Sequence, residues 1–392
     1  MKKFFYLIIF WLAAFMLLLL IVPIAKEEVP EEPSVIKYLD LIDMIKQNEG
    51  SVRVILQTTD YEGIYHEKVE LFYDNQDIIL DENCTESNYH IAPVERGITV
   101  KSIQRTQGNP TYLGVLDIYK TEQGFVIVNE VSLEEYLCSV VPSEMPSSYP
   151  TEALKAQAIC ARTYSSRFFD NMGYPEYGAH MDDSVMYQVY NNIETSPEAI
   201  AAVEATSGQI LCDLEGNLVD TFYYSTGHSD FEKEEPWYAW KYTVDVVDPG
   251  ILQAQLAKVV DYVEVFAEVK RIEVVERGAG NVAQELLVET DTGEYHVFGE
   301  YNIRTVLCNS KADAVKQDGS TYFCKNLIPS GFIEIRCIKE GDVITGYEIE
   351  GNGFGHGNGM SQNGAKNMAA KGLAAQEILQ FYYQDCQVDY LY

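Results

Sequence analysis

Positive charge is scarce in this 392-residue sequence. It contains 28 Lys and Arg residues against 60 Asp and Glu residues, which gives a formal net charge of −32. A surface this acidic repels the phosphate backbone of nucleic acids and the headgroups of anionic lipids. The composition therefore argues against a nucleic-acid partner, and an anionic polymer would need local Lys or Arg side chains to bind.

Motifs for metal, cofactor and nucleophile chemistry are also missing. None of the eight cysteines forms a C-x-x-C pair, and none of the six histidines is spaced to complete a zinc site. The glycine-rich run at residues 351–364 contains neither G-x-G-x-x-G nor G-K-[ST], and the chain has no G-x-S-x-G. We therefore expect no cofactor and no metal. We expect few or no disulfide bonds, because most cysteines fall within apolar runs.

An uncharged apolar run stands near the start of the chain. Residues 4–22 are nineteen residues without a charge, which is long enough to cross a bilayer. Lysines before the run favour a cytoplasmic N-terminus by the positive-inside rule. A cleaved signal peptide is the alternative, but residues 21–25 make a poor cleavage site. We predict a transmembrane anchor at residues 1–25, which makes this a single-pass protein of the cell membrane with the rest of the chain extracytoplasmic.

The rest of the chain divides into three predicted regions. Residues 26–50 are an acidic, Pro-rich linker followed by a short helix, and residues 51–110 are rich in strand-like sequence. Residues 111–392 form the main domain. Strands and helices are mixed there without regular βαβ alternation, which predicts an α+β fold rather than a doubly wound sheet.

Two helices are predicted in the most informative segment, residues 128–165. Ser132 and Glu135 have the spacing of a capping box, which starts the first helix at Leu133. Pro142 is predicted to end this helix, because the residue before a proline is pushed out of the α region. Pro150 suits the first turn of a second, buried helix that we expect to run to about Phe169.

Glu144 lies in the predicted loop of this helix–loop–helix unit. Apolar neighbours disfavour an ionised carboxylate and raise its pKa, which suits a general acid near neutral pH. Without further information, an ordinary capping or surface role is the simpler interpretation of a glutamate. The neighbours expected to frame it are Val140, Val141, Pro142, Met145, Pro146 and Tyr149.

A long pattern runs through the same segment. Residues 128–146 read V-N-x-V-x-L-E-x-Y-L-x-x-V-V-x-S-E-M-P, and residues 152–163 read E-A-L-K-A-Q-A-x-x-A-R-T. The pattern resembles the stage II sporulation protein D (SpoIID/LytB domain) family of membrane-anchored peptidoglycan lytic transglycosylases. Similar pieces continue to Gln362, so that the resemblance covers nearly everything after Ser51. The family's catalytic acid is the Glu of S-E-M-P, which implies Glu144 here.

Polar residues in the matching pieces are candidate substrate contacts. On the second helix, Lys155 and Arg162 would orient Glu144 or face a saccharide carboxylate. The alternative for Arg162 is an ion pair with an internal carboxylate, because an unpaired buried charge is costly. The full set of predicted substrate-binding residues is Lys155, Gln157, Arg162, Ser225, Thr226, Tyr242, His356 and Gln362.

Three further expectations concern the surroundings of this site. The alternating glycines from Gly353 to Gly359 indicate backbone that passes close to another surface or a ligand, and His356 among them has a structural alternative, the capping of a turn. Aromatic platforms for sugars are expected at Trp237, Tyr238, Trp240 and Tyr242. Tyr242 begins a segment similar to one that bears a functional Tyr in the family, although Val244 stands where many relatives carry Lys.

Zinc is bound by some relatives through His and Cys residues after the second helix. This chain has His180, Asp182 and Asp183 in that stretch but no Cys. The comparison with those relatives therefore supports the expectation that there is no metal site.

The resemblance implies a lytic transglycosylase that cleaves MurNAc–GlcNAc bonds of peptidoglycan with formation of 1,6-anhydro-MurNAc during sporulation. The family acts on glycan strands stripped of peptide by an amidase, which implies a cell-wall amidase as a partner. One alternative is a non-catalytic, peptidoglycan-binding amidase enhancer similar to the LytB branch. Another is a hydrolase that uses water, which would need a second carboxylate at a defined distance.

Overall fold

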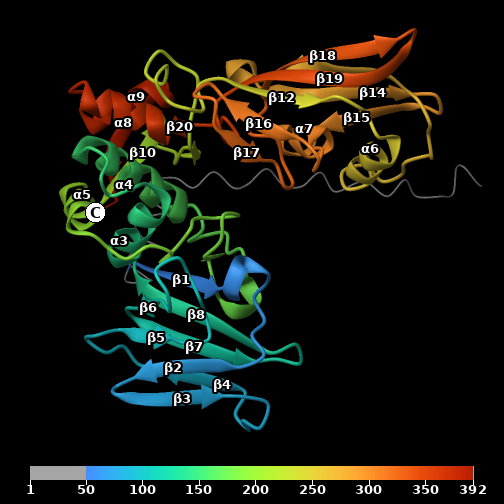
Figure 1. The fold of residues 1–392 in the computed structure, drawn as a ribbon. Coiled ribbons are helices and arrows are strands. Elements are labelled where there is room, and N and C mark those ends of the chain that lie inside the picture. The colour runs from blue at the N-terminus through green and yellow to red at the C-terminus, as the bar shows by residue number, and fades with distance from the viewer. Residues whose placement is uncertain (1–49, 392) are drawn as a thin grey trace, which may run out of the picture. The chain divides into compact units, whose positions relative to one another are not determined.

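A computed structural model describes residues 50–391 of the chain (Figure 1). Among these residues, none of the helices combines the length and the apolar character needed to cross a bilayer. The predicted anchor at residues 1–25 and nearly all of the linker at residues 26–50 lie outside this range, so both stay predictions. Helices and strands alternate irregularly along the described chain, which confirms the α+β expectation.

The first part of the described chain forms two antiparallel-rich sheets. In the five-stranded sheet, of order β4-β7-β8-β1-β9, β1 runs antiparallel to β8 and parallel to β9. Strands from residues 51–110 thus share a sheet with strands from the region that follows. The strands of this sheet are β1 (Ser51–Leu56), β4 (Asn88–Ile91), β7 (Val115–Lys120), β8 (Phe125–Ser132) and β9 (Met181–Asp182). The four-stranded sheet, of order β3-β2-β5-β6, consists of β2 (Val69–Tyr73), β3 (Gln76–Leu80), β5 (Ile98–Val100) and β6 (Thr111–Tyr112).

Five helices gather beside the five-stranded sheet (Figure 1). The central one is α4, which contacts the other four; every residue from Ala156 to Ser166 is buried, as the alanine-rich sequence predicted. The five are α3 (Leu133–Glu144), α4 (Thr151–Ser166), α5 (Pro197–Ala205), α8 (Gln362–Ala370) and α9 (Ala375–Tyr382). Two short ladders lie among them: β10 (Gln209–Asp213) with β21 (Cys386–Tyr390), and β11 (Tyr223–Tyr224) with β20 (Met360–Ser361).

The first helix begins where the sequence predicted but ends later. The Ser132 hydroxyl accepts a hydrogen bond from the Glu135 amide, so Leu133 starts α3. The predicted end before Pro142 is wrong, because Pro142 lies inside the last turn of α3. A proline there removes a single helix hydrogen bond, while its ring is buried in the core. The Ser143 hydroxyl donates to the Ser139 carbonyl at 2.7 Å and supports this last turn.

The second helix is also displaced slightly from its predicted range. Pro150 is the N-cap of α4 rather than a residue of its first turn, and α4 ends at Ser166 instead of Phe169. Glu144 is therefore the last residue of α3, and a six-residue connection, 145–150, leads to α4.

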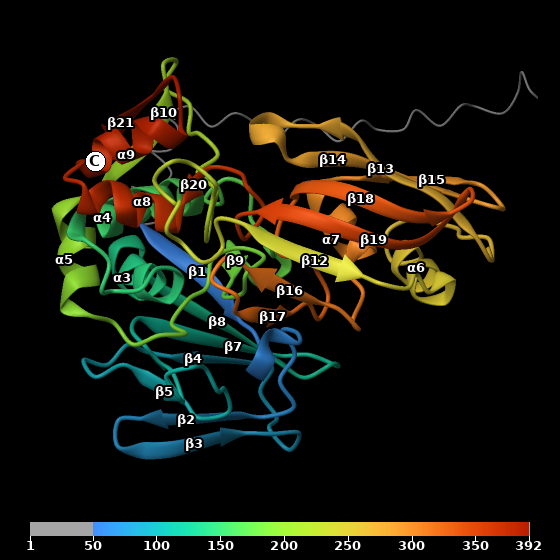
Figure 2. The same cartoon turned by 45° about the horizontal axis from the view of Figure 1, so that its top comes forward.

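Residues 240–352 form two further sheets around a second core (Figure 2). The five-stranded sheet has the order β17-β16-β12-β19-β18, with β12 (Trp240–Val244), β16 (Asp313–Lys316), β17 (Thr321–Phe323), β18 (Phe332–Glu340) and β19 (Val343–Asn352). The three-stranded sheet consists of β13 (Val269–Arg277), β14 (Ala283–Thr290) and β15 (Glu294–Phe298). The helices of this part are α6 (Pro249–Leu256) and α7 (Glu300–Leu307), and the short 3-10 helices of the chain are Thr59–Tyr61, Pro175–Tyr177 and Ala279–Asn281.

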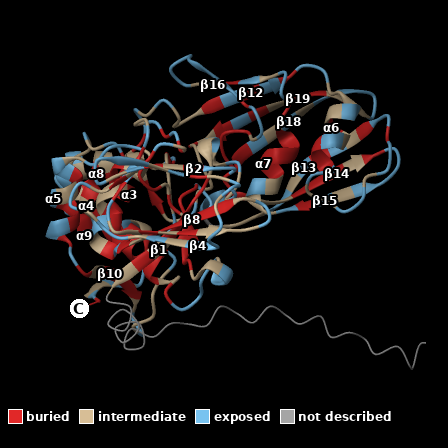
Figure 3. Cartoon of the chain, turned by 90° about the horizontal axis from the view of Figure 1, so that it is seen from below, coloured by how far each residue is buried: buried red, intermediate tan, exposed pale blue. Residues whose placement is uncertain are grey.

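Two main hydrophobic cores stabilise these sheets and helices. The first joins the N-terminal sheets to the helices around α4, and the second lies within residues 240–349. Their buried residues are drawn red in Figure 3. All eight cysteines belong to the described residues and none is bonded to another.

An ion pair joins α3 to α4 at the start of α3. The Arg162 guanidinium is fully buried and donates to both carboxylate oxygens of Glu134 at 2.7 Å. It also donates to the carbonyls of Val203 and Gln209. Arg162 thereby links α3, α5 and β10 to the central helix.

Replacement of Arg162 by Ala is expected to lower the free energy of unfolding by about 3 kcal/mol, because the buried network loses its central donor. Urea unfolding followed by circular dichroism measures this change. The matched control is Arg271→Ala, which removes an exposed pair with Glu273 and should cost under about 1 kcal/mol. Equal losses in the two variants would contradict a structural role for Arg162.

Candidate active site

Glu144 is the last residue of α3. The residue is partly exposed, and a neighbouring loop holds its carboxyl. The amide N–H of Val189 donates to Glu144 Oε1 at 2.6 Å. The side-chain amide of Gln362 donates to the Glu144 carbonyl at 3.0 Å. Both ends of the residue are thus fixed by segments that are distant in sequence.

Burial raises the pKa of Glu144 from its ordinary value to about 7. Hydrogen bonding from the Val189 amide and the Tyr223 hydroxyl lowers the pKa and opposes part of that shift. Near neutral pH the carboxyl can therefore either give or take a proton, as a general acid–base group must. The direction agrees with the sequence analysis.

A buried glutamine orients the Tyr223 hydroxyl. Gln188 donates from Nε2 to the Tyr223 hydroxyl oxygen at 3.1 Å, while its Oε1 accepts from the Ser165 hydroxyl at 2.7 Å. Because the Tyr223 oxygen already accepts a hydrogen bond from Gln188, its own proton is directed elsewhere. The carboxylate of Glu144 is the acceptor whose pKa that hydroxyl lowers.

The loop of residues 183–193, which carries Val189 and Gln188, is anchored at both ends. At its start, the buried side chains of Arg105 and Asp183 form an ion pair at 2.7 Å. At its end, the Ser143 hydroxyl accepts from the amides of Asn192 and Ile193. Ser143 precedes Glu144, so the loop is tied directly to the residue beside the carboxyl that it covers.

Two glutamines connect Glu144 to α4 and α8. Gln362, the first residue of α8, reaches both the Glu144 carbonyl and, at 3.4 Å, the side-chain oxygen of Gln157. Gln157 is fully buried, and its Nε2 donor has no hydrogen-bond partner among residues 50–391. The structure therefore brings the predicted residues Gln157 and Gln362 to Glu144.

Ser225 and Thr226 join the same region through Asn363. The Asn363 side chain donates to the Thr226 hydroxyl at 2.9 Å and accepts from the Tyr149 hydroxyl at 2.7 Å. The Ser225 carbonyl accepts a hydrogen bond from the Asn363 backbone amide. Because Asn363 follows Gln362, these hydroxyls belong to the polar surroundings of the site.

His356 lies on the other side of Tyr223. Its Nδ1 accepts from the Asn358 amide at 3.1 Å, so its Nε2–H donates to the Tyr223 carbonyl at 3.0 Å. Burial lowers the pKa of His356, which keeps the ring neutral at neutral pH. These contacts match the structural alternative for His356, and its contact with substrate stays a prediction.

The alternating glycines pass close to β11, as their spacing predicted. A Cβ on Gly359 would lie 1.9 Å from the Phe222 carbonyl oxygen, and one on Gly355 would lie 2.8 Å from Tyr224 Cβ. Both residues have positive φ, 74° and 119°. Only glycine permits this approach, which places His356 against Tyr223.

Comparison with known proteins divides the chain into two matched parts. The family model described as "Stage II sporulation protein" (SpoIID) matches residues 121–212, and a domain of unknown function (DUF8618) matches residues 206–359. Stage II sporulation protein D of Bacillus subtilis (strain 168) is 30% identical over 294 residues, which cover 70% of this chain and 78% of that protein. The chain belongs to the stage II sporulation protein D family.

Two other relatives show the spread of the family. Stage II sporulation protein D of Bacillus amyloliquefaciens is 29% identical over 310 residues, covering 74% of this chain and 84% of that protein. The amidase enhancer of Bacillus subtilis (strain 168) is 27% identical over 295 residues, covering 63% of this chain but 39% of the enhancer. The site of this family member draws on both matched parts, because Glu144 comes from the first and Tyr223 from the second.

Three predicted contacts are engaged elsewhere. Lys155 pairs with Glu152 at 2.7 Å, and Arg162 pairs with Glu134, ten residues or about 15 Å along α3 from Glu144. Tyr242 is fully buried in the second core, where its hydroxyl donates to the Asn309 carbonyl at 2.9 Å. Their predicted substrate roles stay predictions that these contacts do not support.

The residues of the predicted metal-free stretch all have protein partners. His180 Nδ1 accepts from the Arg53 amide, Asp182 accepts from the Tyr174 hydroxyl, and Asp183 pairs with Arg105. Within residues 50–391, no group of three or more His, Cys, Asp and Glu side chains is arranged to hold a metal ion.

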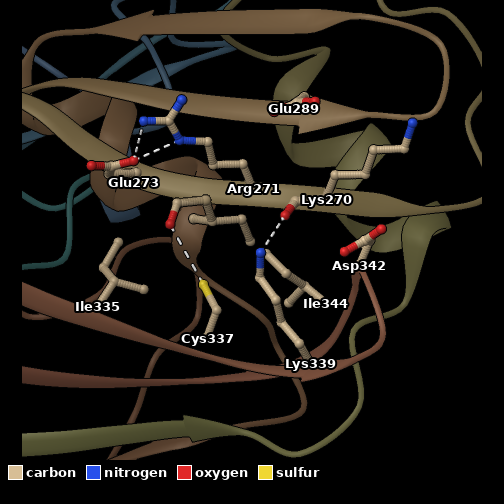
Figure 4. Close-up of a pocket in the computed structure, with 10 residues that line it drawn as sticks. Lys270, Arg271, Glu273, Glu289, Ile335, Cys337, Lys339, Asp342 and Ile344 are labelled. Atoms are coloured by element: carbon tan, nitrogen blue, oxygen red, sulfur yellow. Dashed lines mark hydrogen bonds and ion pairs between the residues drawn. The ribbon is translucent and has the colours of Figure 1, made fainter.

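A surface hollow of about 720 Å³ lies away from these residues, between β13, β14, β18 and β19 (Figure 4). Two of its charged groups have local partners: Arg271 pairs with Glu273, and the Lys339 ammonium donates to the Lys270 carbonyl. None of the predicted site residues lines it.

Sequence reasoning missed the loop that covers Glu144. Val189 acts through its backbone N–H, which leaves no mark in the side-chain pattern. Tyr223 and Gln188 could have been suspected only from the polar ends that aromatic and amide residues bring to a buried site. Their contacts with Glu144 join it to segments that lie about 45 and 80 residues further along the chain.

The raised pKa of Glu144 has a consequence for stability. The folded protein holds the proton more tightly than the unfolded chain, so wild-type stability should fall as pH rises from about 4.5 to about 7. Glu144→Gln removes this loss, and its stability relative to wild type should increase over that range by about 1 to 3 kcal/mol. Urea unfolding at pH 4.5, 6 and 8 measures the difference. A pH-independent difference, like that expected for the exposed control Glu294→Gln, would contradict the buried acid.

Proposed function

We propose that this protein is a lytic transglycosylase that cleaves the MurNAc–GlcNAc bonds of peptidoglycan. The observation that carries the proposal is Glu144, a partly exposed residue whose carboxyl has a pKa raised by burial to about 7. Its location in the S-E-M-P element of the sporulation protein D family supports the same role. A single acid of this kind is sufficient for the reaction.

The reaction begins with proton transfer. Glu144 protonates the glycosidic oxygen as the bond from that oxygen to MurNAc C1 breaks, and the GlcNAc end leaves with a hydroxyl group. The C6 hydroxyl oxygen of MurNAc then bonds to C1, and its proton returns to the Glu144 carboxylate. The product is 1,6-anhydro-MurNAc, and the acid is regenerated without water. A pKa near 7 serves both the acid and the base step.

The groups around Glu144 have matching roles in this proposal. The Val189 amide and the Tyr223 hydroxyl stabilise the carboxylate that forms after the first proton transfer. Gln157 is fully buried, so in this proposal it supports the site from behind through its contact with Gln362. Gln362 fixes both Gln157 and the end of α3.

The proposed cellular setting draws on the names of the relatives and on the N-terminal sequence. We place the enzyme at the cell membrane through residues 1–25, with residues 51–392 facing the wall during sporulation. The names of the relatives support a role in sporulation and link one relative to an amidase. The proposed substrate is peptide-stripped glycan, and the proposed partner is the amidase that strips it.

A second candidate function is amidase enhancement without catalysis. It is favoured by one observation, the 27% identity to the amidase enhancer of Bacillus subtilis. This function requires glycan or amidase binding but no proton transfer at Glu144. The two candidates differ in their products.

Wild-type protein incubated with peptide-free glycan strands is expected to release 1,6-anhydro-MurNAc ends, detected by mass spectrometry. Glu144→Gln should reduce their rate of formation at least about 10³-fold, because amide nitrogen cannot donate the required proton. Ser147→Ala, three residues on in the same connection, is the control for local disturbance. Reducing MurNAc ends would identify a hydrolase instead. No product from wild type, with stimulation of an added amidase, would identify an enhancer.

Tyr223→Phe is expected to shift the pH dependence of the rate. Activity should fall as pH rises through about 7, since Glu144 loses the proton that it must donate. Loss of the Tyr223 hydroxyl raises the Glu144 pKa, so the fall should move upward by about 0.5 to 1 pH unit. The control is Tyr347→Phe, which removes a buried hydroxyl bonded to the Leu307 carbonyl in the second core. Identical pH profiles for all three proteins would rule out the Tyr223 contribution.

A further inference from the structure

Five rings form a continuous aromatic strip beside Glu144. Their centroids are spaced 5.3 Å from Tyr187 to Phe168, 5.2 Å from Phe168 to Tyr164, 6.1 Å from Tyr164 to Phe222 and 6.3 Å from Phe222 to His356. The rings come from four separate segments: the loop over Glu144, the C-terminal end of α4, the approach to β11, and the glycine-rich turn. No pattern along the sequence connects them.

The strip is continuous with the proposed acid. Tyr223, whose hydroxyl lowers the Glu144 pKa, follows Phe222 directly, and Val189, whose amide donates to Glu144, stands two residues after Tyr187. The His356 ring also holds the Tyr223 carbonyl. A molecule lying along the strip therefore lies near the segments that hold the carboxyl.

The strip is open to solvent as well as packed. Phe222 is 41% exposed, Tyr164 is buried beneath it, and the other three rings are half-buried. The adjoining loop residues Val185 and Met186 are about 80% exposed. Exposed apolar side chains gathered in this way mark a candidate contact surface.

The backbone beneath Phe222 is rigid. Its carbonyl accepts from the Tyr383 hydroxyl at 2.6 Å and from the Met360 amide at 3.0 Å. Gly359 packs against the same carbonyl at a distance that a side chain would prevent. The ring is thus held in place before any ligand arrives, which lowers the entropy cost of binding.

We infer that this aromatic strip is a binding track for the glycan chain, on whose exposed rings the pyranose rings of the sugars stack beside the bond to be cleaved. The inference rests on the proposed function and names how that site holds its polymer.

The chemistry of the strip selects a sugar polymer over other ligands. A pyranose ring presents its C–H bonds on its faces, and these pack on aromatic rings by dispersion and by exclusion of water. The His356 ring in the strip is neutral, because burial lowers its pKa. An uncharged surface within a chain of net charge −32 suits neutral ring faces better than an anionic backbone.

The test uses full-length protein carrying Glu144→Gln, which binds without turnover. Isothermal titration calorimetry with peptide-free GlcNAc–MurNAc oligosaccharides gives the dissociation constant. Adding Phe222→Leu, which keeps apolar bulk but removes the ring, should weaken binding about tenfold. Phe222→Trp should keep the parent affinity. The matched control Phe298→Leu, on β15 and 62% exposed, should also keep it.

Each outcome decides the question. The track is overturned if the dissociation constant of Phe222→Leu stays within twofold of that of the parent. It is also overturned if the parent does not bind these oligosaccharides, which is the result expected if an apolar peptide is the true occupant. If Phe222→Leu weakens binding while protein with an intact Glu144 yields no anhydro ends, the track stands and the transglycosylase proposal fails. If anhydro ends form but Phe222→Leu changes neither binding nor KM, the transglycosylase proposal stands and the track fails.

Discussion

The hydrogen bond from the Val189 amide to the Glu144 carboxyl is the interaction on which the candidate site depends. Burial alone would raise the pKa of Glu144 and leave the carboxyl protonated at neutral pH. The Val189 amide and the Tyr223 hydroxyl offset part of that effect and bring the pKa to about 7. Without these donors the group would act only as an acid; with more donors it would stay ionised. The balance requires the loop to remain where it is.

That requirement explains why so much of the fold converges on the loop of residues 183–193. The buried Arg105–Asp183 pair fixes its start, and the Ser143 hydroxyl fixes its end. Gln188, within the loop, is held in turn by Ser165 of α4. The helix that carries the acid, the helix packed against it and the N-terminal sheet therefore position one amide donor together. The Glu144 carboxyl is thus held in place by the loop as well as by its own helix.

Local signals in the sequence predicted local structure well. The Ser132–Glu135 capping box starts α3 at Leu133, and the alanine-rich segment is the buried central helix. The rule that failed was the stop at Pro142. A proline inside a helix costs about 3 kcal/mol, but here it lies in the last turn, where its ring and the neighbouring Val141 are buried in the core. Tertiary packing, which no short window of sequence contains, decided where Glu144 stands.

The candidate site could be predicted only where a side chain carries the chemistry in a local motif. Gln362 links Glu144 to Gln157, whereas the aromatic platform expected around Trp240 and Tyr242 lies in the second core. The rings beside Glu144 instead come together because the glycines at 355 and 359 let the backbone of the turn lie directly against β11. The alternating glycines were visible in the sequence, but the surface that they approach was not. Close contacts between backbone segments therefore set both the pKa of Glu144 and the aromatic surface beside it. In the sequence, such contacts are visible only as residues that lack a side chain.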